Sequence, residues 1–151
     1  MEISKYLHPE ATILQMDGGN SEDVIRGLGD KLFSLGHVKD DFVDATLQRE
    51  ANMPTGLPLE GSINAAIPHV DIEFVNSPAL GLATLKEPVT FYNMVETETE
   101  VPVRLVIMLA LDQPKSQVEM LRSVAQVLQN TALVNQLMEA TSFEEVISAL
   151  K

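Results

Sequence analysis

The feature that most limits the possible folds is a nearly continuous apolar run around position 105. Residues 103–109 are apolar except for Arg104, and the strongly apolar stretch continues to Leu111. This run is far shorter than the ~20 residues that a membrane-spanning helix needs. Such a run is typical of a strand that is buried on both faces of its sheet. The sequence therefore predicts a central strand with other elements packed on each side of it.

The first third of the chain predicts one strand and two helices. The strand stops at the turn sequence of residues 17–20. Ser21 can cap the first helix, whose apolar residues recur at helical spacing, and Gly36 can close it. Pro54 and Gly56 mark the end of the second helix, in which Phe42 and its apolar neighbours face inward. The expected bounds are 11–16 for the strand, 21–36 for the first helix and 41–52 for the second.

The middle of the chain predicts strands, and the last third predicts helices. The capping box of Ser116 and Glu119 marks a helix start, and Pro114 either begins this helix or only precedes it. Another such box at Ser142 and Glu145 caps the last helix. Short strands are expected at 58–59, 64–67, 79–85, 89–92 and 103–109, a loop at 97–100, an inward helical stripe at Val118, Leu121, Ala125 and Leu128, and further helices at 132–139 and from 143.

This order of elements predicts one α/β domain over residues 1–151. Its core is expected to be a mixed sheet of about five strands, covered by helices on both faces. The start of the chain lacks the apolar segment of a signal peptide, so the default expectation is a soluble, cytoplasmic protein with no insertion into a membrane.

Charge and cysteine content exclude several classes of function. The net charge of −12 and the scattered Lys and Arg residues disfavour nucleic acid and anionic membranes as partners. A partner with a basic face would be attracted, although acidity also simply keeps a protein soluble. The absence of cysteine removes disulfides, thiolate nucleophiles and cysteine-held metal sites. The sequence also lacks the glycine-rich phosphate loop, the dinucleotide fingerprint and the serine-hydrolase elbow.

Histidine is therefore the first candidate for a nucleophile or a proton carrier. His8 is expected in an exposed N-terminal tail and His37 at an exposed helix end, and neither needs a role. His69 follows the apolar stretch 63–67 and Pro68, which suits the end of a strand because it has no N–H. A side chain just past a strand end is held by the sheet yet open to solvent, which suits a reactive group, but position alone still favours a structural histidine. The spacing of the histidines gives no metal-binding motif.

The residues around His69 closely resemble the phosphorylation-site signature of a known family. The family is the enzyme IIA domains of the fructose/mannitol class of the bacterial phosphoenolpyruvate-dependent sugar phosphotransferase system. The galactitol-type branch is the most similar. The resemblance covers most of the chain. It rests on Arg49-Glu50-Ala51, Pro54-Thr55-Gly56-Leu57, Gly61, Ala66-Ile67-Pro68-His69, Leu85–Val89, Phe91, Val103–Ile107, Asp112, Pro114–Gln117 and Leu121-Arg122.

This resemblance implies a phosphocarrier that needs no cofactor. Such a domain accepts a phosphoryl group from the small carrier protein HPr and passes it to a IIB component, which works with the membrane component IIC. His69 falls on the phosphorylated histidine of the family, and Arg49 on its active-site arginine, although Arg49 is alternatively a surface residue paired with Asp44 or Glu50.

Two further residues are candidates for supporting the phosphate. Thr55 can donate a hydroxyl hydrogen bond or simply serve a turn. Gln117 stands where many members of the family have a second histidine, so it can hydrogen-bond to His69 or to the phosphate but cannot act as an acid or base. The sequence leaves open a regulatory module of the same family, a domain that no longer accepts phosphate, the identity of the sugar and the oligomeric state.

Overall fold

Within residues 2–151, which the structure describes, five strands form one mixed sheet in the order β1-β4-β5-β3-β2. The structure is a computed structural model. The central pair, β4 and β5, is antiparallel, whereas β1 pairs with β4 and β3 with β5 in parallel. The strands are β1 (Leu7–Met16), β2 (Gly56–Leu57), β3 (Ala65–Ala66), β4 (Ala79–Tyr92) and β5 (Glu100–Ala110). The predicted central position of the apolar run in β5 is therefore confirmed.

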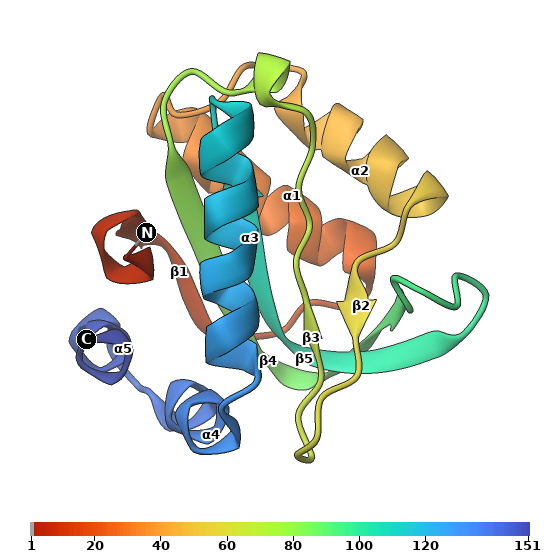
Figure 1. The fold of residues 1–151 in the computed structure, drawn as a ribbon, viewed down its shortest axis with the longest axis vertical. Coiled ribbons are helices and arrows are strands. Elements are labelled where there is room, and N and C mark those ends of the chain that lie inside the picture. Colours follow the sequence, from red (N-terminus) through yellow and green to blue (C-terminus); the bar gives the residue numbers. More distant parts are fainter. Residues whose placement is uncertain (1) are drawn as a thin grey trace.

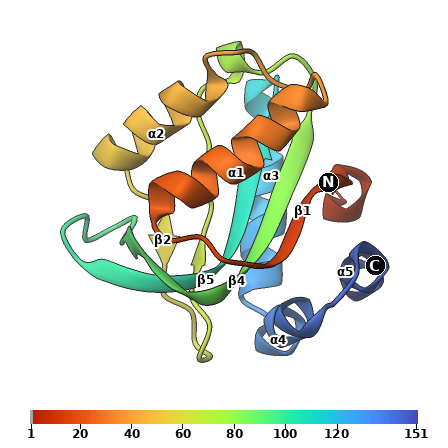
Figure 2. The ribbon, with the colours of Figure 1, turned by 180° about the vertical axis from the view of Figure 1, so that it is seen from behind.

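Helices cover both faces of this sheet, as predicted. One face carries α1 and α2, and the opposite face carries α3, with α4 and α5 beyond its C-terminal end (Figures 1 and 2). The helices are α1 (Ser21–Ser34), α2 (Phe42–Asn52), α3 (Pro114–Leu128), α4 (Thr131–Glu139) and α5 (Phe143–Leu150), with short 3-10 helices η1 (Ile3–Lys5) and η2 (Ile72–Phe74).

Each face has its own hydrophobic core, and β5 contributes to both of them. Val106 and Met108 pack with α1 and α2, whereas Leu105 and Ile107 pack with α3, α4 and α5. Successive side chains of a strand point to opposite faces, so a strand between two helical layers must be apolar at nearly every position. This explains why the run in β5 shows no alternation of polar and apolar residues.

Strand β1 is longer than predicted, and the expectation that His8 lies in an exposed tail is wrong. The strand begins at Leu7 and includes both His8 and Pro9. It is an edge strand, where a proline is tolerated because its missing N–H costs no hydrogen bond between neighbouring strands. The pairing of β1 with β4 also shifts register between Leu7 and Thr12. The His8 ring is half-buried, and its centroid lies 4.5 Å from that of the His37 ring.

The two strands predicted at 79–85 and 89–92 are one continuous strand, β4. Its exposed residues Lys86–Pro88 fall in a register shift between Thr84 and Val89, which accommodates the proline without ending the strand. Strand β5 begins at Glu100, so the acidic loop is shorter than predicted. Strand β2 covers residues 56–57, just before the predicted 58–59.

Three expectations about helix ends and faces are corrected. Asn20, not Ser21, caps α1, because its side chain accepts a hydrogen bond from the Asp23 N–H at 2.8 Å. Pro114 lies in the first turn of α3, so Ser116 is inside the helix and forms no capping box. The buried face of α3 consists of Met120, Val124 and Leu128, whereas Val118 is 56% exposed and Ala125 is exposed.

Other helix boundaries are as predicted. Ser142 caps α5, because its hydroxyl accepts from the Glu145 N–H at 3.2 Å. Gly36 follows the end of α1 with a φ of +83°, a conformation that glycine adopts without strain. None of the helices within residues 2–151 combines the length and the apolar character needed to cross a bilayer.

Candidate functional site

His69 lies in the segment that follows β3 and runs between α2 and α3 (Figure 1). The segment continues along β5: the Leu109 N–H donates to the Pro68 carbonyl at 3.0 Å, and His69 forms an isolated parallel bridge with Leu109. The sheet therefore holds His69, as predicted. The expected exposure is wrong, because the residue is only 8% exposed. The segment stays against the sheet instead of leaving it after β3, and this buries most of the ring.

The hydrogen-bond partners of His69 determine which ring nitrogen carries the proton. Nδ1 lies 2.8 Å from the Ile67 carbonyl oxygen, which can only accept, so Nδ1 must donate. Nε2 lies 3.4 Å from Nη2 of Arg49, which can only donate. The ring is therefore a neutral imidazole with its proton on Nδ1, and Nε2 presents a lone pair toward the guanidinium.

Burial keeps this imidazole neutral. Desolvation is the main reason why the pKa of His69 lies below its usual 6.5, and the neighbouring guanidinium of Arg49 lowers this pKa further. The hydrogen bond to Ile67 and the charge of Asp71 act in the opposite direction and raise the pKa. The net lowering means that the nucleophilic, unprotonated form persists at neutral pH.

Arg49 lies in the last turn of α2 and is the cation of this site. Its Nη1 is 3.9 Å from a carboxylate oxygen of Asp71, and its side chain is 27% exposed. Its Nε is buried and has no hydrogen-bond partner among the described residues. Asp44, a surface partner considered for it, contacts Arg26 instead. An arginine whose Nε–H has no partner, next to a histidine lone pair, can donate a hydrogen bond to an oxygen of an incoming anion.

Thr55, which is buried, and Glu50, which is partly buried, form a hydrogen-bonded pair that supports the site. The Thr55 N–H donates to Glu50 Oε2 at 2.7 Å, and its hydroxyl donates to Glu50 Oε1 at 2.8 Å. The single hydroxyl hydrogen of Thr55 is thus engaged. The same hydroxyl accepts from the Ile67 N–H at 3.2 Å. Burial raises the pKa of Glu50, although its hydrogen bonds with Thr55 and the charge of Arg49 act against this increase.

Gln117, near the start of α3, lies in the surroundings of His69, and no hydrogen bond joins its side chain to the His69 ring in the described part of the chain. Its Nε2 donates to the carbonyl oxygen of Val70 at 3.0 Å. The side chain therefore ties α3 to the residue that follows His69. The sequence singled out His69, Arg49, Thr55 and Gln117, and the structure brings all four to one region. It named Glu50 only as part of the family signature and as a possible partner of Arg49, and it missed Asp71, whose one available signal was its proximity in sequence to His69.

The other histidines take no part in these contacts. His37 shares a 2.8 Å hydrogen bond between its Nδ1 and the Ser77 hydroxyl, and burial together with the nearby His8 lowers its pKa. Neither His8 nor His37 has a hydrogen bond with His69 or Arg49 in the described part of the chain. Across residues 2–151 the acidic and histidine side chains form no group of three that could hold a metal ion.

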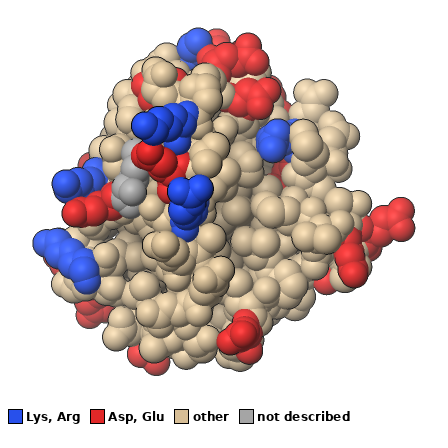
Figure 3. Space-filling model, in the orientation of Figure 1, with Lys and Arg blue, Asp and Glu red and all other residues tan. Residues whose placement is uncertain are grey.

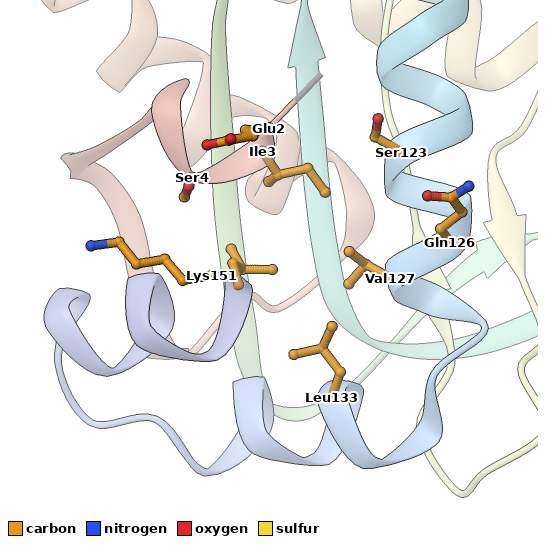
Figure 4. A pocket seen from close by; sticks show the side chains of 9 residues that line it. Glu2, Ile3, Ser4, Ser123, Gln126, Val127, Leu133 and Lys151 are labelled. Carbon is orange, nitrogen blue, oxygen red and sulfur yellow. The ribbon is translucent and has the colours of Figure 1, made fainter.

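A pocket lies away from His69, between η1, α3 and the C-terminal helices (Figure 4). Its volume is about 650 Å³. Apolar side chains such as Ile3, Val127 and Leu133 point into it, and polar ones such as Glu2 and Gln126 lie around them (Figure 4). The described residues that line it include neither histidine nor arginine, so it lacks the nucleophile and the cation found at His69.

Comparison with known protein families shows which family this chain belongs to. Residues 5–151 match the family described as "Phosphoenolpyruvate-dependent sugar phosphotransferase system, EIIA 2". The chain belongs to this family. It is therefore an EIIA domain, a component of a phosphotransferase system, and the resemblance found in the sequence is confirmed.

Three relatives of this EIIA domain show its range. The galactitol-specific EIIA component of Escherichia coli K12 is 32% identical over 115 residues, which cover 76% of this chain and 75% of that protein. The probable licABCH operon regulator of Bacillus subtilis is 26% identical and aligns with 96% of this chain but 21% of its own length. Enzyme IIAMTL of E. coli, solved in complex with phosphorylated enzyme IIBMTL, has a TM-score of 0.77 and 26% identity, with 95% of each chain covered.

Proposed function

We propose that this EIIA domain is a phosphocarrier in sugar import, which accepts a phosphoryl group on His69 from HPr and passes it to a IIB component. The observation that carries the proposal is the Nε2 lone pair of a buried, neutral His69, 3.4 Å from the guanidinium of Arg49. Phosphoryl transfer needs little from a protein beyond a positioned nucleophile and compensation of the charge on the oxygens.

The geometry supports a transfer that needs no proton movement. Nε2 of His69 attacks the phosphorus of a phosphohistidine, and the N–P bond of the donor breaks as the new one forms. The donor leaves as a neutral imidazole, while the His69 ring becomes a phosphorylated imidazolium that keeps its Nδ1 proton on the Ile67 carbonyl. Nε and the terminal nitrogens of Arg49 are the groups that would bind phosphoryl oxygens. In the second transfer a nucleophile of IIB attacks the phosphorus, the Nε2–P bond breaks, and His69 leaves as the neutral imidazole with its proton still on Nδ1.

The roles of Thr55 and Gln117 in this proposal are indirect. The Thr55 hydroxyl is hydrogen-bonded to Glu50, so it supports the phosphate by holding the backbone at Ile67. Gln117 holds the backbone at Val70 on the other side of the histidine. Together these two contacts hold the backbone on both sides of His69, which lowers the entropy that the ring must lose when a partner docks.

The partners are proposed from the family and from the charge of the molecule. On the face of the molecule that carries α3, most of the basic side chains gather at the left of the view among acidic ones, and a largely uncharged area beside them has acidic side chains along its right and lower edges (Figure 3). A partner protein with a basic rim fits such a surface at a net charge of −12. HPr and IIB are the proposed partners, and they place the domain in the cytoplasm, where it serves a membrane IIC without entering the membrane. The similarity to the galactitol-specific component supports a galactitol-type sugar.

A regulatory role is the alternative, and one observation favours it. The B. subtilis regulator aligns with almost the whole of this chain over about a fifth of its own length, so EIIA-like domains also occur within larger regulators. The same histidine would serve both roles. Genes for IIB and IIC components beside the gene of this chain would favour transport, and regulatory genes beside it would favour signalling.

Reconstitution with phosphoenolpyruvate, enzyme I and HPr tests the proposal. The chain should acquire an acid-labile, base-stable label, His69→Gln should abolish it, and His37→Gln should retain it as the matched control. Label that persists on the His69→Gln variant contradicts the site. Transfer from the labelled chain to a galactitol-type IIB supports transport, whereas label that no IIB accepts shifts the conclusion to regulation.

A further inference from the structure

The carboxylate of Glu50 is partly buried beside the site, and it has no part in the phosphoryl transfer proposed for His69. It follows Arg49 on α2, but its side chain turns toward the connection between α2 and β2. Both of its oxygens are used: Oε2 accepts from the Thr55 N–H at 2.7 Å and Oε1 from the Thr55 hydroxyl at 2.8 Å. Hydrogen bonds to an ionised carboxylate are about twice as strong as neutral ones, so this pair fixes the hydroxyl hydrogen of Thr55.

The orientation of the Thr55 hydroxyl then determines whether its oxygen can accept a hydrogen bond from the Ile67 N–H. Because its hydrogen points at Glu50, its lone pairs are free for the Ile67 N–H, which lies 3.2 Å away. The Ile67 N–H also donates to the Thr55 carbonyl at 3.3 Å. Thr55 is 2% exposed and Ile67 is 6% exposed, so water does not compete with these contacts.

Ile67 in turn sets the state of the nucleophile. Its carbonyl oxygen accepts the Nδ1 proton of His69 at 2.8 Å. Arg49 Nη2, a donor 3.4 Å from Nε2, also favours the proton on Nδ1, but it makes the longer of the two contacts, so a displaced Ile67 would weaken the shorter one. The proton would then be free to move to Nε2, where it would face the Arg49 donor and block the lone pair that attacks phosphorus.

We infer that Glu50 is a positioning residue, which acts through Thr55 and Ile67 to hold the proton of His69 on Nδ1 and leave Nε2 as the nucleophile. The consequence for phosphoryl transfer rests on the proposed function of His69, but the effect on the histidine proton does not. The contact chain Glu50–Thr55–Ile67–His69 is called the positioning chain below.

The surroundings of Glu50 allow its charge to change. Glu50 is partly exposed and lines a pocket of about 330 Å³ between α1, α2 and the end of β4, so a proton can approach it from solvent. The titratable groups that face it are Arg49 on its own helix, Glu22 on α1 and Tyr92 on β4. Burial raises the pKa of Glu50. If Glu50 were protonated, its O–H could donate to the Thr55 hydroxyl, which now donates to Glu50. The direction of the first hydrogen bond in the positioning chain would then be reversed.

Replacing Glu50 by glutamine imposes this reversal at neutral pH. Nitrogen NMR of the two histidine ring nitrogens shows which of them carries the proton. In the unmodified protein His69 should show a protonated Nδ1 and an unprotonated Nε2. Glu50→Gln and Thr55→Val should both move these two signals toward the averaged values of mixed tautomers. Glu87→Gln, at an exposed glutamate of β4, is the matched control and should leave them unchanged.

The rate of phosphoryl uptake from phospho-HPr is the second measurement. Glu50→Gln and Thr55→Val should lower the maximal rate about 10- to 100-fold, with little change in the HPr concentration for half-saturation, because the docking surface is intact. Thr55→Ser keeps the hydroxyl and should restore both the ring signals and most of the rate. A role limited to stability would not be expected to give this rescue together with a change in tautomer.

Each outcome bears on the inference. Unchanged ring signals and an unchanged rate in Glu50→Gln would overturn it, as would a Thr55→Val variant that behaves like Thr55→Ser. If Glu50→Gln does not fold, the comparison of Thr55→Val with Thr55→Ser still tests the inference. If the unmodified protein takes no label from HPr, the proposed function fails, while the NMR comparison still tests the positioning chain.

Discussion

At the scale of single residues, Arg49 combines two effects that a substitution can separate. Its positive charge lowers the pKa of His69, and its fork of donors, one of them buried without a partner, is available to an anion. Lysine preserves the charge but not the fork. The two effects therefore predict different behaviour for Arg49→Lys and Arg49→Ala.

We expect Arg49→Ala to raise the pKa of His69, because a charge that opposes protonation is removed, and Arg49→Lys to leave it nearly unchanged. Both variants should take up phosphate more slowly, by about 100-fold for alanine, since removal of one donor to a developing anion commonly costs about 100- to 1000-fold. Proton NMR titration of the His69 ring gives the pKa, and labelling from phospho-HPr gives the rate. A lysine variant with full activity would show that charge alone suffices and that the unpartnered Nε is not used.

At the scale of elements, replacing either of two glycines that lie next to a helix or strand end should destabilise the fold, but for different reasons. Gly36 ends α1 with a φ of +83°, and a Cβ there would meet nothing within 4 Å. Gly56 begins β2 with an ordinary φ, but a Cβ there would lie 2.5 Å from the Tyr92 carbonyl oxygen. The first position requires a backbone conformation, and the second requires space.

Gly36→Ala should lower the free energy of unfolding by about 1–2 kcal/mol, the cost of a left-handed conformation for an L-residue. Gly56→Ala should cost more, about 3 kcal/mol, because backbone atoms must move to admit the methyl group. It should also slow phosphoryl uptake, since Gly56 adjoins Thr55, whereas Gly36→Ala should not. Urea denaturation measures the two losses of stability, and labelling from phospho-HPr measures the two rates of phosphoryl uptake. Equal losses of stability with equal activity would contradict this distinction.

The sequence predicts those elements whose signals are local. The apolar run of β5, the helix of residues 131–139 and the cap at Ser142 need no knowledge of their surroundings. The sequence predicts two strands where the structure has the single strand β4, because a proline such as Pro88 commonly ends a strand. Only the pairing of β4 with β5 shows that a register shift accommodates this proline. The face of α3 was misassigned because Val118 and Met120 are both apolar, and the contact with the sheet decides which is buried.

The candidate site divides in the same way. The residues that carry its chemistry, His69 and Arg49, are recognisable from the family signature. The burial of His69, the unpartnered Nε of Arg49 and the use of Thr55 by Glu50 depend on how α2 and β3 pack, which no short sequence window contains. Sequence therefore identifies the candidate nucleophile, and the three-dimensional contacts indicate which of its nitrogens would react under the proposed function.

At the scale of the whole molecule, the net charge of −12 should govern how fast partners arrive. A carrier has to bind one protein, release it and bind another, so a large part of its efficiency depends on association. Attraction between an acidic protein and a partner with a basic face accelerates encounter by about 10- to 1000-fold at low salt. Salt screens this attraction, since the Debye length falls from about 10 Å at 0.1 M to about 3 Å at 1 M ionic strength.

The second-order rate of labelling from phospho-HPr should therefore fall about tenfold or more when the ionic strength is raised from about 0.05 M to about 0.5 M. Labelling by the small donor phosphoramidate is the control. It involves no protein partner, so its rate should change much less, and any remaining change reports an effect of salt on the His69 site itself. A rate from phospho-HPr that is independent of salt would contradict electrostatic steering. It would assign docking instead to uncharged surface such as the largely uncharged area in Figure 3.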